Sequence, residues 1–217
     1  MICGVDEAGK GSVLGPMVVA AVGAPSDDVF SDLDVKDSKL LSSERREHMF
    51  RFITKRCSIA TLVIPANEID ERRKEMSLNT CVARAHAAVI RRLQPETAYV
   101  DACDVNPERY ARMVRENLDG GVCRIVSEHH ADRTYRIVSA ASIVAKVVRD
   151  REVREISKTY GTIGSGYPSD PLTIAFLSSY IRKHHCAPAC ARKSWKTIGN
   201  LMAVDEQSTL FADPGPE

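Results

Sequence analysis

The chain has 217 residues, of which 44% are hydrophobic and 27% charged, and its formal net charge is +1. This length can bury a substantial core, as one large domain or one domain with a small appendage. No segment approaches the ~18 consecutive apolar residues of a membrane span, and the N-terminus lacks the pattern of a signal peptide. The seven cysteines are scattered and odd in number. They indicate reduced thiols in a cytoplasmic protein rather than a disulfide framework.

The first apolar strand runs into two adjacent acids, Asp6 and Glu7, and then into a turn formed by Gly9, Lys10 and Gly11. Buried carboxylates are costly to desolvate, so they favour a cation or solvent. Glycines let a ligand approach the backbone and offer N–H groups to anions. The combination suggests metal-assisted chemistry on a phosphate ester; the alternative is a strand that ends in a polar turn. Because side chains alternate along a strand, the two acids converge only if the strand ends there.

Apolar runs bounded by glycine or proline predict further strands, and capping residues predict the helices between them. We expect strands at 17–23, 59–64, 98–101 and 122–126, and helices at 43–56, 78–93 and 107–117. This order predicts an α/β protein with a mixed five-stranded sheet flanked by helices.

Two further acids stand where this topology would gather them. Asp101 ends the strand at 98–101, and Asp132 lies just before a long helix expected at about 135–158. Strand-end acids separated by crossover units meet at one edge of an open α/β sheet. Alternatively, Asp101 begins a turn and Asp132 caps the helix, which is a common role for aspartate. One shared site accounts for all four acids more simply than four separate roles.

A narrow polar stripe crosses the otherwise apolar long helix at helical spacing: Ser139, Ser142, Lys146 and Arg149. Such a stripe either faces water or, if the helix packs on the sheet near Asp132, lines the catalytic groove.

A glycine-rich loop then carries Tyr167 to a helix at about 170–185 capped by Ser169, and a last helix is expected at 191–202. These helices predict a core at 1–168, a small C-terminal helical appendage at 169–203 and a disordered acidic tail at 204–217. The segment 182–196 holds five Lys or Arg residues, no acid and Trp195. It fits a nucleic-acid backbone or, alternatively, a solvated helical face.

The histidines and cysteines of this region do not predict a zinc site. His184, His185, Cys186 and Cys190 are close in sequence, but no second pair of cysteines supports them.

The ordered motifs resemble those of the ribonuclease HII family (type 2 ribonuclease H) in its archaeal form. The resemblance covers residues 1–200, through Gly4-Val5-Asp6-Glu7-Ala8-Gly9-Lys10-Gly11, Asp37-Ser38-Lys39, Tyr99-Val100-Asp101, Ala131-Asp132-Arg133-Thr134-Tyr135, Ser139 to Lys146, Arg149-Asp150, Gly164 to Asp170 and Arg192-Lys193-Ser194-Trp195. The short acidic motif alone is weak, whereas the ordered set is specific.

This resemblance implies a ribonuclease H-like fold and an endonuclease. It implies cleavage of the RNA strand of RNA/DNA hybrids and incision 5′ of single ribonucleotides in duplex DNA. The products would carry a 5′-phosphate and a 3′-hydroxyl, and the role would be ribonucleotide removal in DNA replication and repair. Asp6, Glu7, Asp101 and Asp132 would be the catalytic residues and would hold Mg²⁺ or Mn²⁺, with two ions ~4 Å apart. We expect a monomer that does not bind membranes.

By the same resemblance, backbone groups of Gly9, Lys10 and Gly11 and the Tyr167 hydroxyl would read the 2′-hydroxyl. The Tyr167 ring would support the neighbouring deoxyribose. Many family members carry arginine in place of Lys10, so the grip on phosphate there is expected to be weaker. Lys39 and Lys146 are further candidates for phosphate contacts; the alternative for either lysine is simple solvation.

The tail contains half of a sliding-clamp (PCNA) binding box. Gln207 and Leu210 fit its first half, the usual aromatic pair is replaced by Asp213 and Pro214, and Phe211 is a substitute anchor. A disordered acidic tail without a partner is the alternative.

Two other functions share some of these features. Another ribonuclease H-like nuclease or strand-transfer enzyme would use the acids without reading the 2′-hydroxyl. A non-catalytic nucleic-acid binder of the same fold would not need all four acids.

Overall fold

The computed structural model describes residues 1–31, 42–118, 120 and 123–210. It divides the chain into two compact units. The first unit contains Met1–Ala8, Met17–Val63 and Met76–Arg149, and the second contains Gly9–Pro16, Ile64–Glu75 and the chain from Asp150 onward. The division expected at residue 168 differs from this one, because segments far apart in sequence pack together in the second unit.

The sheet consists of β1 (Ile2–Ala8), β2 (Met17–Ala24), β3 (Ser58–Ile64), β4 (Thr97–Asp101) and β5 (Arg124–Glu128). Its order is β3-β2-β1-β4-β5, with β1 antiparallel to β2 and parallel to β4, and with β4 parallel to β5. The predicted mixed five-stranded sheet is confirmed, although β5 begins two residues later than expected. Because β1, β4 and β5 are parallel, their carboxyl ends lie at the same edge of the sheet.

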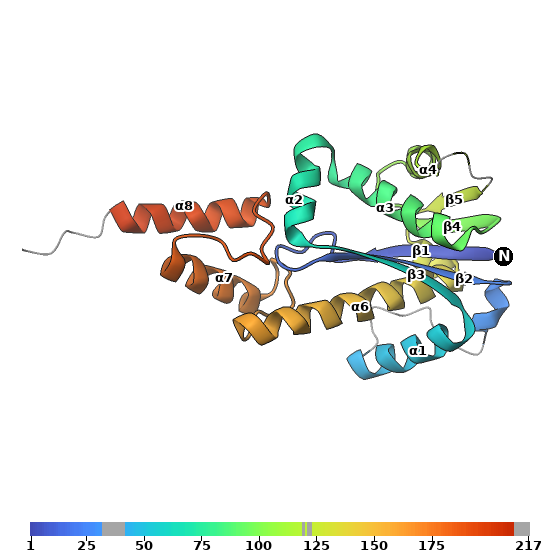
Figure 1. Cartoon of the computed structure of the whole chain (residues 1–217), viewed down its shortest axis with the longest axis horizontal. Helices are drawn as coiled ribbons and strands as arrows, with labels where there is room; N and C mark the ends of the chain where they lie inside the picture. Colours follow the sequence, from blue (N-terminus) through green and yellow to red (C-terminus); the bar gives the residue numbers. More distant parts are fainter. Residues whose placement is uncertain (32–41, 119, 121–122, 211–217) are drawn as a thin grey trace, which may run out of the picture. The chain divides into compact units, whose positions relative to one another are not determined.

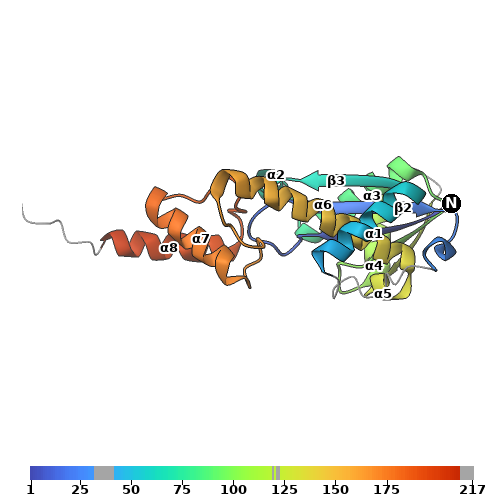
Figure 2. The ribbon, with the colours of Figure 1, turned by 90° about the horizontal axis from the view of Figure 1, so that it is seen from below.

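Helices cover both faces of the sheet in the first unit (Figures 1 and 2). The short 3-10 helix η1 (Asp27–Phe30), α1 (Ser43–Arg56) and the first part of α6 (Arg136–Tyr160) lie on one face, and α3 (Leu78–Leu93) and α4 (Pro107–Glu116) on the other. The predicted helices are confirmed, and the side chains of Ser42, Ser77 and Asn106 accept the capping hydrogen bonds of α1, α3 and α4.

The core between β2 and α6 follows the period-2 pattern of the strand. Every second residue of β2, starting at Val18, packs with the apolar face of α6 and with Met49 and Ile53 of α1. Three of the four residues of the polar stripe of α6, Ser139, Ser142 and Arg149, are buried, and Lys146 is half-buried. The stripe therefore belongs to the interior of the first unit.

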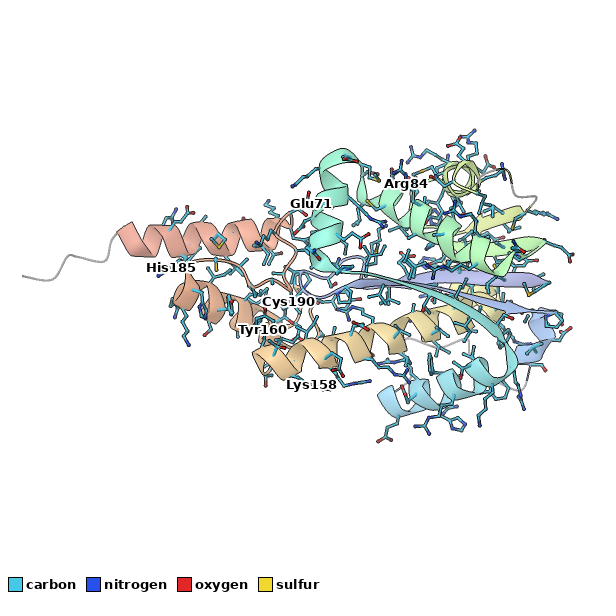
Figure 3. All side chains as sticks on the ribbon, viewed as in Figure 1. Glu71, Arg84, Lys158, Tyr160, His185 and Cys190 are labelled. Carbon is cyan, nitrogen blue, oxygen red and sulfur yellow. The ribbon has the colours of Figure 1, made fainter. Side chains whose placement is uncertain are left out.

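The second unit has its own core. It contains α2 (Ala66–Glu75), the end of α6, α7 (Pro171–His184) and α8 (Lys196–Leu210). Leu14 forms a β-bridge with Ala191, and both pack in a cluster with Val153, Leu177 and Ile198. Tyr160 and Cys190 lie side by side in this unit (Figure 3). The helix α2 was not predicted, because only Ala66 and Ile69 of its ten residues are buried, which leaves a weak apolar pattern.

The C-terminal region differs from expectation at both of its helices. Asp170, rather than Ser169, caps α7 by accepting a hydrogen bond from the amide of Leu172. The last helix begins at Lys196 and continues to Leu210, so the predicted disordered tail from residue 204 was wrong for residues 204–210. Asp205 explains the extension, because this buried carboxylate lies 2.9 Å from His185 Nδ1 and fastens α8 to the end of α7. Residues 211–217 lie outside the described part of the chain.

Within the described ranges, no helix has both the length and the apolar character needed to cross a bilayer. All seven cysteines are free thiols.

Gly4 of β1 determines how closely α6 can approach the sheet. A side-chain carbon at this position would overlap the backbone of Ile137 and Val138. Neither main chain can move without disturbing the core, so Gly4→Ala should lower the free energy of unfolding by about 1–3 kcal/mol or more. Urea denaturation measures this change.

Gly199 of α8 provides the matched control, because nothing lies within 4 Å of the carbon that alanine would add there. Gly199→Ala should be neutral or stabilise the protein by about 0.5–1 kcal/mol through helix propensity. Equal stability of the two variants would contradict the close approach of α6 to β1.

Candidate active site

Asp6 and Glu7 are consecutive residues within β1, which continues through both of them to Ala8. They pair with Ala20 and Val19 of β2, so their side chains leave opposite faces of the strand. The two acids were expected to converge only if the strand ended at them. Because β1 continues to Ala8, this condition is not met.

Each acid has a different partner on its own face. Asp6 accepts a hydrogen bond from Ser142 of α6. Glu7 Oε2 lies 3.1 Å from His86 Nε2 of α3. Asp6 also accepts a 2.7 Å hydrogen bond from the amide of Glu7. The two faces of the sheet thus fix one acid each.

Asp101 is the last residue of β4, beside β1 in the sheet. Its Oδ1 accepts a 2.9 Å hydrogen bond from the amide of Ala131, the first residue of the short helix α5 (Ala131–Thr134). Asp132 follows directly and is buried. It does not cap the long helix α6, because it lies inside α5 and α6 begins only at Arg136. The bond to Ala131 therefore brings Asp132 to the end of β4.

The pKa values of Asp6 and Asp101 are raised by burial and by the charges of neighbouring acids. Burial is the main cause that raises the pKa of Asp6 well above its usual value, and the charges of Glu7 and Asp101 raise it further. Burial also raises the pKa of Asp101; the hydrogen bond from Ala131 opposes this, while Asp132 and Glu7 reinforce it. Asp101 is therefore within electrostatic reach of the other three acids, and Asp6 is within reach of Glu7. Among the described residues, no lysine or arginine is a main influence on either pKa.

As they stand, no three His, Cys, Asp or Glu side chains in the described ranges form a ready metal site. This agrees with mutual repulsion and with the opposite faces of Asp6 and Glu7. The donor set nevertheless fits a hard divalent cation, because it supplies only carboxylate oxygens, shielded from water and in excess negative charge. Side-chain movement would have to accompany binding of an ion.

Two residues near the acids, His86 and Tyr110, were not predicted from the sequence. His86 is fully buried in α3, and its Nδ1 lies 3.1 Å from the hydroxyl of Tyr110 in α4. A lone histidine inside an alanine-rich apolar helix is the sequence signal that would have pointed to it.

Lys146, expected to contact phosphate, is half-buried on α6 in the first unit.

The proposed 2′-hydroxyl reader lies in the second unit. Gly9 has φ of 82°, a left-handed conformation that favours glycine. Its amide donates a 3.2 Å hydrogen bond to the hydroxyl of Tyr167. Around Gly11, an added side-chain carbon would meet no atom within 4 Å, so open space adjoins the backbone there.

Arg192 holds this glycine loop from inside. It is fully buried and donates hydrogen bonds to the carbonyls of Gly9 (2.6 Å), Lys10 (3.0 Å) and Gly15 (3.1 Å). The sequence placed Arg192 in a basic surface patch, and that assignment was wrong. Its role here is to fix the shape of the loop.

The remaining predicted residues are exposed or lie outside the described part of the chain. Lys39 and Phe211 are outside it. Gln207 is exposed on α8, and Leu210 is the last residue of that helix.

Comparison with known proteins identifies the family. A family model for ribonuclease HII matches residues 3–198. A ribonuclease HII of Methanoregula boonei is 63% identical over 210 residues, which cover 97% of this chain and 98% of that protein. The structure of the PCNA:RNase HII complex from Archaeoglobus fulgidus contains a chain that is 44% identical, with a TM-score of 0.87 and coverage of 93% of this chain and 96% of that one. Ribonuclease H2 from Pyrococcus horikoshii OT3 is 36% identical, with a TM-score of 0.88 and coverage of 95% and 99%. The chain therefore belongs to the ribonuclease HII family and is a ribonuclease H enzyme.

Proposed function

We propose that this enzyme hydrolyses the RNA strand of RNA/DNA hybrids and also incises duplex DNA 5′ of single embedded ribonucleotides. The products carry a 5′-phosphate and a 3′-hydroxyl, and the enzyme serves ribonucleotide removal in DNA replication and repair. The observation that carries the proposal is the electrostatic coupling of Asp6, Glu7, Asp101 and Asp132 in the first unit. Family membership supports the hybrid substrate, and the acids support the chemistry.

Asp6, Glu7, Asp101 and Asp132 would hold Mg²⁺ or Mn²⁺, which activates water and stabilises the charge on the leaving oxygen. The chain's own contribution is to hold the acids in place. The amide of Ala131 orients Asp101, and Ser142 orients Asp6. Both donors are neutral, so they fix the carboxylates without cancelling the charge that attracts a cation.

Gly9 and Tyr167 are the proposed readers of the 2′-hydroxyl. The Tyr167 oxygen accepts a hydrogen bond from the Gly9 amide, which holds the phenol beside the glycine loop. Lys10, Lys39 and Lys146 are proposed phosphate contacts. A strand-transfer enzyme would not need Gly9 and Tyr167, and a non-catalytic binder would not need the four acids.

We also propose that the C-terminal segment binds a sliding clamp through Gln207, Leu210 and Phe211. The related chain from Archaeoglobus fulgidus was solved in complex with PCNA, which supports this partner. Gln207 is exposed on α8 and so is accessible to a partner.

Asp101→Asn should abolish cleavage of a duplex that contains one ribonucleotide, because it removes a ligand charge at almost constant volume. Binding of the duplex should persist or tighten, since one charge that repels phosphate is gone. Single-turnover cleavage with Mg²⁺ or Mn²⁺, next to an all-DNA control duplex, measures the first effect. Near wild-type turnover would overturn the proposed four-carboxylate site.

The same variant should raise the melting temperature of the metal-free protein at neutral pH. The pKa of Asp101 is raised in the folded state, so its ionised form opposes folding at pH values above that pKa. The gain should shrink as the pH falls and the wild-type carboxyl becomes protonated. Melting curves in EDTA from neutral to acidic pH test this.

Asp104, three residues later, is the matched control with the opposite sign. Hydrogen bonds from the Asn106 amide and from Arg109 lower the pKa of Asp104, so its charge stabilises the fold at neutral pH. Asp104→Asn should lower the melting temperature at neutral pH, with a loss that fades as the pH falls through the folded-state pKa. It should leave the cleavage step intact at a temperature where the variant is folded. If both variants shifted the melting temperature in the same direction, the repulsion assigned to Asp101 would be wrong.

Tyr167→Phe should slow cleavage about 2- to 13-fold, because one hydrogen bond is worth roughly 0.5–1.5 kcal/mol. Tyr167→Ala should lose more on a single embedded ribonucleotide than on a continuous RNA strand, since the ring also supports the deoxyribose beside it. Tyr160→Phe, which removes a hydroxyl from the same unit, is the control and should not alter substrate preference. Equal losses on both substrates that follow the melting temperature would make Tyr167 a structural residue.

Calorimetry with the cognate sliding clamp tests the C-terminal segment. Gln207→Ala and Phe211→Ala should each weaken binding without changing cleavage of short duplexes. Glu206→Ala, its exposed neighbour on α8, should bind as the wild type does. If the full-length chain gives no heat of binding with the clamp at tens of micromolar, the proposed clamp interaction is wrong.

A further inference from the structure

A buried hydrogen-bonded chain leads from α4 through α3 to Glu7. The Tyr110 hydroxyl lies 3.1 Å from His86 Nδ1, and His86 Nε2 lies 3.1 Å from Glu7 Oε2. Tyr110 and His86 are both fully buried, and all three residues belong to the first unit. The catalytic roles proposed above use Glu7 but assign nothing to His86 or Tyr110.

The direction of these hydrogen bonds follows from Tyr110. Burial raises the pKa of its hydroxyl well above the usual value, so the hydroxyl keeps its hydrogen. Cys103 also interacts with this hydroxyl, but a thiol sulfur is a far weaker acceptor than an imidazole nitrogen. The hydroxyl therefore donates to Nδ1, and Nε2 is the ring nitrogen that faces the Glu7 carboxylate as a donor.

Glu7 needs such an anchor. The charge of Glu7 raises the pKa values of Asp6 and Asp101, so these two acids repel it. The Glu7 side chain is only 11% exposed. Without a donor, repulsion would turn the flexible glutamate away from the other acids towards solvent. A lysine or arginine in place of His86 would hold it but would also cancel the negative charge that attracts a cation. An imidazole N–H can orient the carboxylate through one hydrogen bond without the permanent charge of those side chains.

We propose that His86 is a positioning residue that holds Glu7 in place for a divalent cation, and that Tyr110 acts through His86 by fixing its tautomer. This inference rests on the proposed carboxylate metal site and adds to it a second layer of residues. Partners of this kind typically change metal affinity about 10- to 100-fold when they are removed.

Binding of Mn²⁺ to the nucleic-acid-free protein, measured by calorimetry at one pH, tests the proposal. His86→Phe should weaken Mn²⁺ binding about 10-fold or more. His86→Gln, whose side-chain amide can still donate to Glu7, should recover part of the loss. Tyr110→Phe should weaken binding by a smaller factor, because it releases the tautomer without removing the ring. Higher Mn²⁺ concentrations should restore cleavage in all three variants.

Two controls separate positioning from packing. The first control is Tyr135→Phe, which removes a different tyrosine hydroxyl. This hydroxyl donates a 2.7 Å hydrogen bond to Glu128, and its loss should leave Mn²⁺ binding unchanged. In the His86→Phe background, Tyr110→Phe should have no further effect on Mn²⁺ binding, because Tyr110 acts only through the ring. Melting temperatures in EDTA identify any variant that fails to fold. If His86→Phe fails to fold, Tyr110→Phe and His86→Gln test the positioning role of His86.

Wild-type affinity for Mn²⁺ in folded His86→Phe would overturn the role of His86. So would a Tyr110→Phe substitution that weakens Mn²⁺ binding as much in the His86→Phe background as in the wild type. In both cases Asp101→Asn would still weaken binding, and the carboxylate site would stand. If Asp101→Asn bound Mn²⁺ as tightly as the wild type, the proposed metal site itself would be wrong, and this inference with it.

Discussion

Repulsion among four carboxyl groups at one edge of a sheet is the constraint on which the rest of the site depends. Parallel strands β1 and β4 end at the same edge, so the topology brings Asp6 and Glu7 near Asp101, although the side chains of Asp6 and Glu7 leave opposite faces of β1. Helix α5 adds Asp132 through the hydrogen bond between Ala131 and Asp101. Burial is the main cause of the raised pKa values of Asp6 and Asp101, and the charges of the neighbouring acids add to it.

The fold resists this repulsion with neutral hydrogen-bond donors. Ser142 on α6 holds Asp6 from one face of the sheet, His86 on α3 lies against Glu7 from the other, and a backbone amide holds Asp101. Gly4 allows α6 to approach β1 closely, which places Ser142 within reach of Asp6. Neutral donors keep the acids in place while the cluster retains its attraction for a cation. In the second unit, Arg192 plays a comparable structural role by holding the carbonyls of the glycine loop.

Much of this arrangement was predictable from local sequence. The strands and most helices follow apolar periodicity and capping residues such as Ser77 and Asn106, which act within a few residues. The positions of Asp101 at the end of β4 and of Asp132 shortly before α6 were predictable, whereas β1 continues through Asp6 and Glu7 to Ala8. What failed depends on contacts between distant segments. Arg192 is buried because it meets Gly9, and α8 reaches Leu210 because His185 holds Asp205. The partnership of His86 with Glu7 joins residues 79 positions apart, and no local pattern encodes it.

Anomalous diffraction from crystals of the full-length protein grown with Mn²⁺ tests whether the four acids bind a metal ion. We expect an anomalous peak in contact with carboxylate oxygens of Asp6, Glu7, Asp101 and Asp132, with His86 still bonded to Glu7. Saturating Mn²⁺ bound elsewhere, with the four acids unchanged and no ion among them, would contradict it.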